Sequence, residues 1–249
     1  STPIKSSAAS DVYKRQNKNF TLTATAKVNN WKYTNGQEGF GLMAADAVGN
    51  NGDSSVFWNN SYMASVTKVE YYSNVDEETG EATVSKTSGE KISMKLGIGS
   101  QEKIGVNKNN LSKLLDNDSD TVNNEFKTTM STLETSKLGS AAGTFNLIGN
   151  YSNTDATFEG TTVENPITEV KLTIQKNNTG YFVTYESVDG SYSMTKKYYD
   201  PSALSKIDEE NVYVGFFTSR FAEATFSDVS FSTSDPANDP PAEEKPIEE

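Results

Sequence analysis

Residues 20–28 alternate between apolar and polar side chains with a period of two, and this pattern constrains the fold more than any other feature of the chain. Threonine or lysine separates the apolar residues, which are Phe20, Leu22, Ala24, Ala26 and Val28. Successive side chains of a strand point to opposite faces of a sheet. The alternation therefore predicts a half-buried β-strand.

Similar segments recur along the chain and are separated by turn residues. Further strands are predicted at residues 39–45, 56–72, 91–99, 103–106, 170–174, 181–185, 212–218 and 224–231. The sequence Asn-Asn-Thr-Gly at residues 177–180 is typical of a hairpin turn between two of them. Short strands joined by such turns predict an all-β, antiparallel β-sandwich.

The sandwich is expected to occupy residues 19–232. Residues 1–18 are interpreted as a non-native or linker segment, because residues 6–16 resemble a translated adaptor sequence. Residues 107–140 are interpreted as a loop or partly helical insertion, since Phe126, Met130 and Leu133 are three and four positions apart.

The last segment, residues 233–249, is acidic and rich in proline. Such a composition buries too little apolar surface to fold alone, so a disordered linker is expected there. A linker implies a further module in the same parent chain, and a catalytic module is the expected one.

Charge and residue usage exclude several classes of function. The chain carries 22 basic and 34 acidic residues, a net charge of −12, which argues against nucleic acid and anionic membranes as partners. The absence of cysteine excludes disulfides and thiolate metal sites, and the absence of histidine excludes a histidine general base or zinc ligand. No apolar run approaches the roughly 18 residues of a membrane span.

Three short motifs carry a family resemblance. Residues 214–220 (Val-Gly-Phe-Phe-Thr-Ser-Arg) and 224–229 (Ala-Thr-Phe-Ser-Asp-Val) resemble the closing strands of concanavalin-like jelly-roll modules, especially accessory regions of secreted bacterial pectate lyases. Residues 41–46 resemble the matching early strand, in which an arginine often precedes the aspartate; here Ala45 precedes Asp46. The resemblance implies a sandwich that binds polysaccharide, with pectin as the expected ligand and Asp46 as a candidate contact.

Arg220 is a candidate contact for a uronate carboxylate. The only other arginine is Arg15, in the segment excluded from the fold. A guanidinium can hold a carboxylate through two parallel hydrogen bonds, which lysine does less well. The alternative is a surface arginine paired with Glu223 or Asp228.

Trp58, Asn60 and Tyr62 are a second candidate site, because they would share one face of a strand. Two aromatic planes around an amide suit a sugar, whose CH-rich faces stack on rings while its hydroxyls bond the amide. The alternative is that the two rings face the core.

Asp116, Asp118 and Asp120 place carboxylates at alternate positions, as a calcium loop begins. Thr121 and Lys127 stand where an EF-hand loop has its glycine and its bidentate glutamate. Calcium is thus a candidate cofactor, with a solvated acidic loop as the alternative.

These observations predict a secreted, non-catalytic carbohydrate-binding module that holds a polysaccharide-degrading enzyme on the plant cell wall, with pectin or homogalacturonan as ligand. Secretion is expected because the cysteine-free composition, rich in Asn, Thr and Ser, resembles extracellular bacterial modules. Two alternatives stay open: a polysaccharide lyase or glycoside hydrolase on the same fold, and a cell-surface adhesin domain.

Overall fold

The computed structural model describes most of the chain outside residues 104–167. The described residues are 9–14, 17–32, 38–46, 61–66, 68–73, 76, 78–79, 83–85, 91–95, 99–103, 128–132, 168–190, 193–205, 209–219 and 221–247. Structural statements below refer to these residues.

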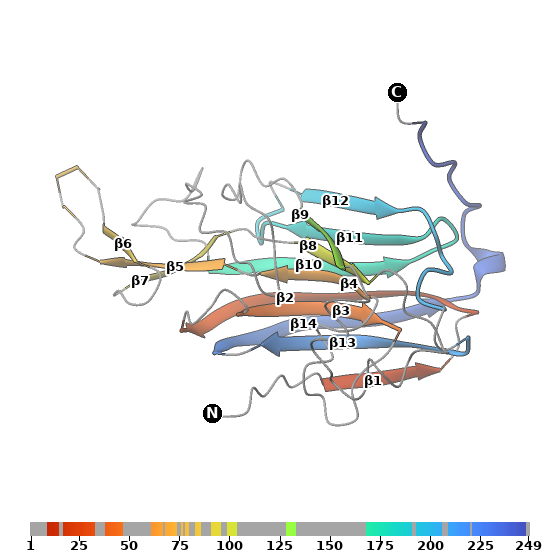
Figure 1. The fold of residues 1–249 in the computed structure, drawn as a ribbon, viewed down its shortest axis with the longest axis horizontal. Coiled ribbons are helices and arrows are strands. Elements are labelled where there is room, and N and C mark those ends of the chain that lie inside the picture. The colour runs from red at the N-terminus through yellow and green to blue at the C-terminus, as the bar shows by residue number, and fades with distance from the viewer. Residues whose placement is uncertain are drawn as a thin grey trace.

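The described strands form three antiparallel sheets (Figure 1). The six-stranded sheet has the order β1 (Ala9–Lys14), β13 (Asn211–Ser219), β3 (Gly39–Ala45), β4 (Ser61–Val66), β8 (Gly99–Lys103) and β9 (Thr128–Thr132). The five-stranded sheet has the order β12 (Ser193–Tyr198), β11 (Tyr181–Glu186), β10 (Glu169–Lys176), β2 (Asn19–Trp31) and β14 (Ala222–Ser234). A small third sheet consists of β6 (Thr83–Ser85), β5 (Lys68–Ser73) and β7 (Lys91–Lys95).

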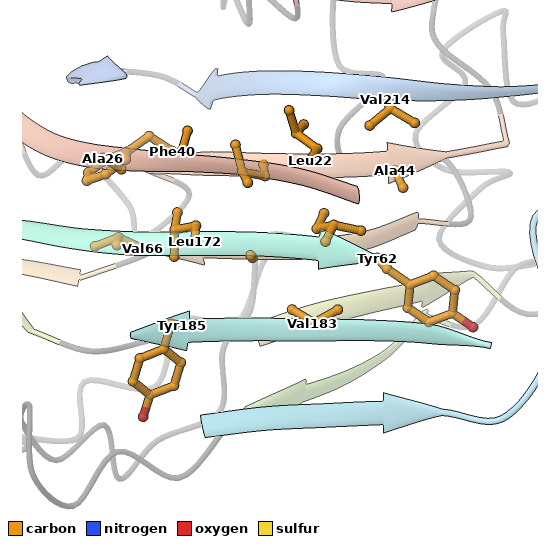
Figure 2. Packing of buried hydrophobic residues seen from close by; sticks show 14 of the residues in the cluster. Leu22, Ala26, Phe40, Ala44, Tyr62, Val66, Leu172, Val183, Tyr185 and Val214 are labelled. Atoms are coloured by element: carbon orange, nitrogen blue, oxygen red, sulfur yellow. The ribbon is translucent and has the colours of Figure 1, made fainter. Parts of the chain in front are cut away.

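The two large sheets enclose one hydrophobic core. On β2 the apolar members of the alternation from Phe20 to Val28 are buried, and the threonines between them are only partly buried. They pack with residues from both sheets (Figure 2), including Phe40, Ala44, Tyr62, Leu172, Val183 and Val214. The fold is therefore an antiparallel β-sandwich, which confirms the predicted fold class.

The hairpin between β10 and β11 also forms as predicted. Lys176 is paired with Tyr181, and the backbone N–H of Asn177 donates to the carbonyl of Gly180 over 2.9 Å. The Asn177 side-chain oxygen accepts hydrogen bonds from the backbone N–H groups of Thr179 and Gly180, at 2.9 and 3.0 Å. The asparagine thus supplies the acceptor that closes the turn.

The predicted strands differ from the observed ones in how they pair. The expected long strand at 56–72 includes two described strands, β4 and β5, which belong to different sheets. The last two strands, β13 and β14, also lie in different sheets.

The helix predicted within residues 107–140 is wrong where the structure describes this segment. Residues 128–132 form strand β9, which pairs with β8. Three of these five residues are threonines, whose branched side chains favour strands over helices. The remainder of the predicted insertion lies outside the described residues.

The two flanking segments are more ordered than expected. Within residues 1–18, β1 pairs with β13 over six residues and forms one edge of the six-stranded sheet. After β14 the chain forms a short 3₁₀ helix, η1 (Pro236–Asn238), capped by the side chain of Asp235. Residues 235–247 are called the tail below, and Figure 1 shows them leaving from the end of β14.

Candidate functional site

A groove of about 360 Å³ lies between the outer face of the five-stranded sheet and the tail. Its lining comes from β2, β10, β11 and β14, from the β10–β11 hairpin turn, and from tail residues that include Pro240 and Pro241. Pockets that bind small ligands typically measure about 300–1,000 Å³, so the groove is large enough for a small ligand.

Part of the groove lining is a row of four side chains that crosses four strands: Phe182, Gln175, Thr21 and Ser232. Gln175 is paired with both Phe182 and Thr21, and Thr21 with Ser232. These residues point away from the core, because their strand neighbours such as Leu22 are buried in it. The row therefore presents an aromatic ring, an amide and two hydroxyls on one surface.

Asn178, at the tip of the hairpin, fixes the tail beside this surface. Its side-chain N–H groups donate to the carbonyls of Pro236 and Pro240, at 2.9 and 2.8 Å. Its side-chain oxygen accepts a 3.0 Å hydrogen bond from Asn19 at the start of β2. One asparagine thus joins the hairpin, β2 and two points of the tail.

A second contact holds the tail further along. The backbone N–H of Glu243 donates to the Thr179 hydroxyl over 2.8 Å, and the Glu243 carboxylate pairs with Lys197 of β12 at 2.6 Å. The Lys197 ammonium also lies over the Phe182 ring, 4.8 Å from its centroid. Its hydrogen bond with Glu243 raises the pKa of Lys197.

Two aspartates complete the attachment. Asp235 pairs with Lys18 at 2.9 Å, and this hydrogen bond lowers the pKa of Asp235. Asp239 lies in the groove lining and accepts hydrogen bonds from the Ser234 hydroxyl and the Asn19 amide, at 2.6 and 2.7 Å. These two bonds lower the pKa of Asp239, so its carboxylate stays ionised in mildly acidic solution. The described tail is thus held against the sandwich by long-range contacts, which composition does not report.

Tyr62, one of the predicted sugar contacts, lies in the core of the described structure. Its ring is stacked on Tyr181, with centroids 4.7 Å apart, and lies 4.6 Å from the ring of Tyr198. Asp46 is buried as well. The pKa of Tyr181 is raised by its burial and, in addition, by the negative charge of Asp46. Tyr62 and Asp46 are thus only 3% and 1% exposed.

The other candidates from the sequence lie outside the described residues. They are Trp58, Asn60, Arg220, Asp116, Asp118 and Asp120. Among the described residues, no group of three acidic side chains could hold a metal ion. The same residues include no helix of the length and hydrophobicity that a membrane crossing requires.

One signal in the sequence could have pointed to the groove. Along β11 the residues alternate as Tyr-Phe-Val-Thr-Tyr-Glu, so Phe182 and Thr184 share the outward phase. An aromatic ring at an outward position, beside the predicted hairpin, indicates a surface suited to ligand binding.

A family profile matches residues 112–236, which is half of the chain. The profile is described as the pectate disaccharide-lyase N-terminal domain. This chain belongs to that family. The matched region contains β10 to β14 and therefore most of the groove lining, whereas the lining residues of β2 and those of the tail from Asp239 onward lie outside it. No curated protein sequence matches the chain.

Three solved structures are similar to the chain at low sequence identity. A seed lectin from Lotus tetragonolobus is 13% identical, over 94% of this chain and 83% of the lectin, with a TM-score of 0.43. The CBM2 module of the evolved Dit protein of Lactobacillus casei BL23 phage J-1 is 8% identical, over 89% of this chain and 66% of the module, with a TM-score of 0.33. An alginate lyase from Klebsiella pneumoniae is 12% identical, over 87% of this chain and 60% of the lyase, with a TM-score of 0.35.

Proposed function

We propose that this domain is a non-catalytic carbohydrate-binding module of a secreted pectin-degrading protein, and that its ligand is plant cell-wall pectin. The observation that carries this proposal is the groove beside Phe182. It combines an aromatic ring with the Gln175 amide and with hydroxyls, including that of Thr21. Carbohydrate ligands offer CH-rich faces and many hydroxyls, and such a surface has a complementary group for each.

The family assignment supports the choice of polymer. The family is described as the N-terminal domain of a pectate disaccharide-lyase, which suits a module attached to a pectate-degrading enzyme. Binding of the module to the polymer would raise the concentration of substrate around a tethered catalytic domain. The module would then contribute attachment, and its tethered partner would carry out the reaction.

The lowered pKa of Asp239 and the ion pair of Glu243 support a role of the groove in binding rather than in catalysis. A general acid for glycoside cleavage needs a raised pKa, so that it is protonated at working pH. Hydrogen bonds from Ser234 and Asn19 lower the pKa of Asp239 instead. Glu243 is held by Lys197 in an ion pair. Asp239 is therefore not prepared to donate a proton.

Affinity electrophoresis on a panel of polysaccharides tests the proposal, with assays for reducing sugar and for the ultraviolet absorbance of unsaturated uronides on the same samples. We expect retardation by pectin and release of no product. Product release would support the alternative of a lyase or hydrolase on this fold. Failure to bind any polysaccharide would refute the proposal and leave the adhesin alternative.

Calcium at Asp116, Asp118 and Asp120 belongs to the proposal as a candidate stabilising ion. If calcium binds there, chelation lowers the melting temperature and added calcium restores it, since ligand binding favours the folded state by mass action. An unchanged melting temperature after thorough chelation would return these residues to the solvated-loop alternative.

A further inference from the structure

The cations near the groove are engaged with the protein itself. Lys197 pairs with Glu243, and Lys18 pairs with Asp235. Lys176 lines the groove but is only 5% exposed, and its ammonium donates to the backbone carbonyl of Lys18 over 3.3 Å. Burial also lowers the pKa of Lys176. None of these three ammonium groups is held ready for a carboxylate on a ligand.

The acidic side of the groove is not neutralised in the same way. Asp239 receives its two side-chain hydrogen bonds from Ser234 and Asn19, which are both neutral. Its negative charge therefore acts on whatever occupies the groove, whereas the Glu243 carboxylate, also in the lining, is paired with Lys197. The net charge of −12 on the chain acts in the same direction at longer range.

The remaining lining suits an uncharged ligand. Thr21 and Ser232 carry hydroxyls on the outer face to which the described part of the chain supplies no hydrogen-bond partner. Phe182 and two adjacent prolines, Pro240 and Pro241, provide apolar surface on the sheet side and on the tail side. A pyranose ring with hydroxyls and no charge can use all of these groups.

We propose that the groove binds an uncharged pyranose unit, which in pectin is a methyl-esterified galacturonate, in preference to a unit with a free carboxylate. This inference rests on the proposed function and specifies its ligand. Methyl esterification removes the ligand charge that Asp239 would repel, and it adds a methyl group for the apolar walls. The inference departs from the expectation that Arg220 binds a uronate.

The test compares pectins that share one backbone and differ only in methyl esterification, from highly esterified to fully de-esterified. We expect binding to weaken about tenfold across the series at low salt, which corresponds to about 1.4 kcal/mol. Because salt screens the repulsion between carboxylates, the difference should shrink as ionic strength rises. Asp239→Asn should reduce the preference by improving binding to the de-esterified polymer.

Two groove variants and one control locate the site. Phe182→Ala and Thr21→Val should each weaken binding to esterified pectin, by about tenfold and about threefold. Thr25→Val is the matched control, because Thr25 lies on the same face of β2, about 13 Å further along the strand. Circular dichroism melts check that each variant is folded.

The outcomes separate this inference from the proposed function. Equal or tighter binding of de-esterified pectin at low salt would overturn the inference and leave pectin binding intact. Unchanged binding of esterified pectin by both Phe182→Ala and Thr21→Val would also overturn the inference. Loss of binding in Arg220→Ala, restricted to the de-esterified polymer, would show that Arg220 holds a uronate and would overturn the inference. If the wild-type domain binds no polysaccharide, both proposals fail together.

Discussion

Replacing Gly180 by alanine tests how the β10–β11 hairpin is seated against the chain that follows β12. Gly180 has a φ of +157°, a backbone conformation that residues other than glycine rarely adopt. A Cβ atom built on it would lie 1.8 Å from the carbonyl oxygen of Tyr198 and 2.8 Å from the backbone nitrogen of Asp200. Both obstacles are backbone atoms, so no side-chain rotation can relieve the contact.

The expected loss of stability follows from the backbone strain at residue 180 and from the displacement of the hairpin from Tyr198. A backbone conformation of this kind costs an ordinary residue about 1–3 kcal/mol. Separating the hairpin from Tyr198 also disturbs the packing of that ring on Tyr62, and similar aromatic pairs are worth about 0.5–1.5 kcal/mol. We expect Gly180→Ala to lower the free energy of unfolding by about 1.5–4.5 kcal/mol, a large share of the stability of a typical domain.

Gly190→Ala is the matched control. Gly190 also has a positive φ, of +71°, but nothing lies within 4 Å of the position of its Cβ. This substitution should therefore cost only the left-handed conformation, about 1 kcal/mol. Urea unfolding followed by fluorescence and by circular dichroism gives both values. If the two variants lose equal stability within about 0.5 kcal/mol, the close approach to Tyr198 does not determine the effect, and the reasoning is refuted.

Three further predictions concern the core and the tail. Tyr181→Phe should leave the free energy of unfolding unchanged or raise it by about 1 kcal/mol in urea titrations, because the buried Tyr181 hydroxyl finds no hydrogen-bond partner among the described residues; a loss above 1 kcal/mol would contradict this. Asn178→Ala should cost about 2 kcal/mol and raise hydrogen exchange along the tail, whereas Asn238→Ala, at an exposed position, should change neither. The folded-state pKa values of Asp235 and Asp239 are lowered from 3.8, so their contribution to docking is present above that pH and is lost as the pH falls through the lower values; NMR titration of the tail amides measures the loss, and tail signals unchanged through that range would contradict it.

The strands that could be predicted are those in which burial alternates. On β2 and on the β10–β11 hairpin one face meets the core and the other meets solvent, so the period of two is visible in the sequence. Strand partners could not be predicted in this way. β13 and β14 are neighbours in sequence and alternate similarly, yet they pair with β3 and β2 in different sheets. Alternation identifies the buried face of a strand and leaves its neighbours undetermined.

Tyr62 shows a second reason for error. Alternation fails where both faces of a strand are buried, as on β3, whose seven residues are all buried. In β4, which pairs with β3, Tyr62 and Met63 point to opposite faces and are both buried. The sequence therefore offers no polar phase from which the solvent side of Tyr62 could be inferred.

The tail and the groove were missed because their contacts join distant parts of the chain. Asn19 and Asp239 are 220 residues apart, and Asn178 and Pro240 are 62 apart. An acidic, proline-rich segment has the composition of a linker, and only its partners on the sandwich make it ordered. Those partners are single polar residues, which carry no periodic signal.

Docking of the tail and binding in the groove are linked thermodynamically if the groove is the ligand site. Pro240 and Pro241 belong both to the tail and to the groove lining, so a ligand that contacts them binds the docked tail better than the free one. Such a ligand favours docking, by as much as about 2.7 kcal/mol at a concentration of 100 times its Kd when it binds only the docked form. By the same linkage, any change that releases the tail lowers the apparent affinity in proportion to the docked fraction. Polymer binding would thus fix the direction in which the chain leaves the sandwich, and the attachment points at Asn178 and Thr179 would set that direction relative to the polysaccharide.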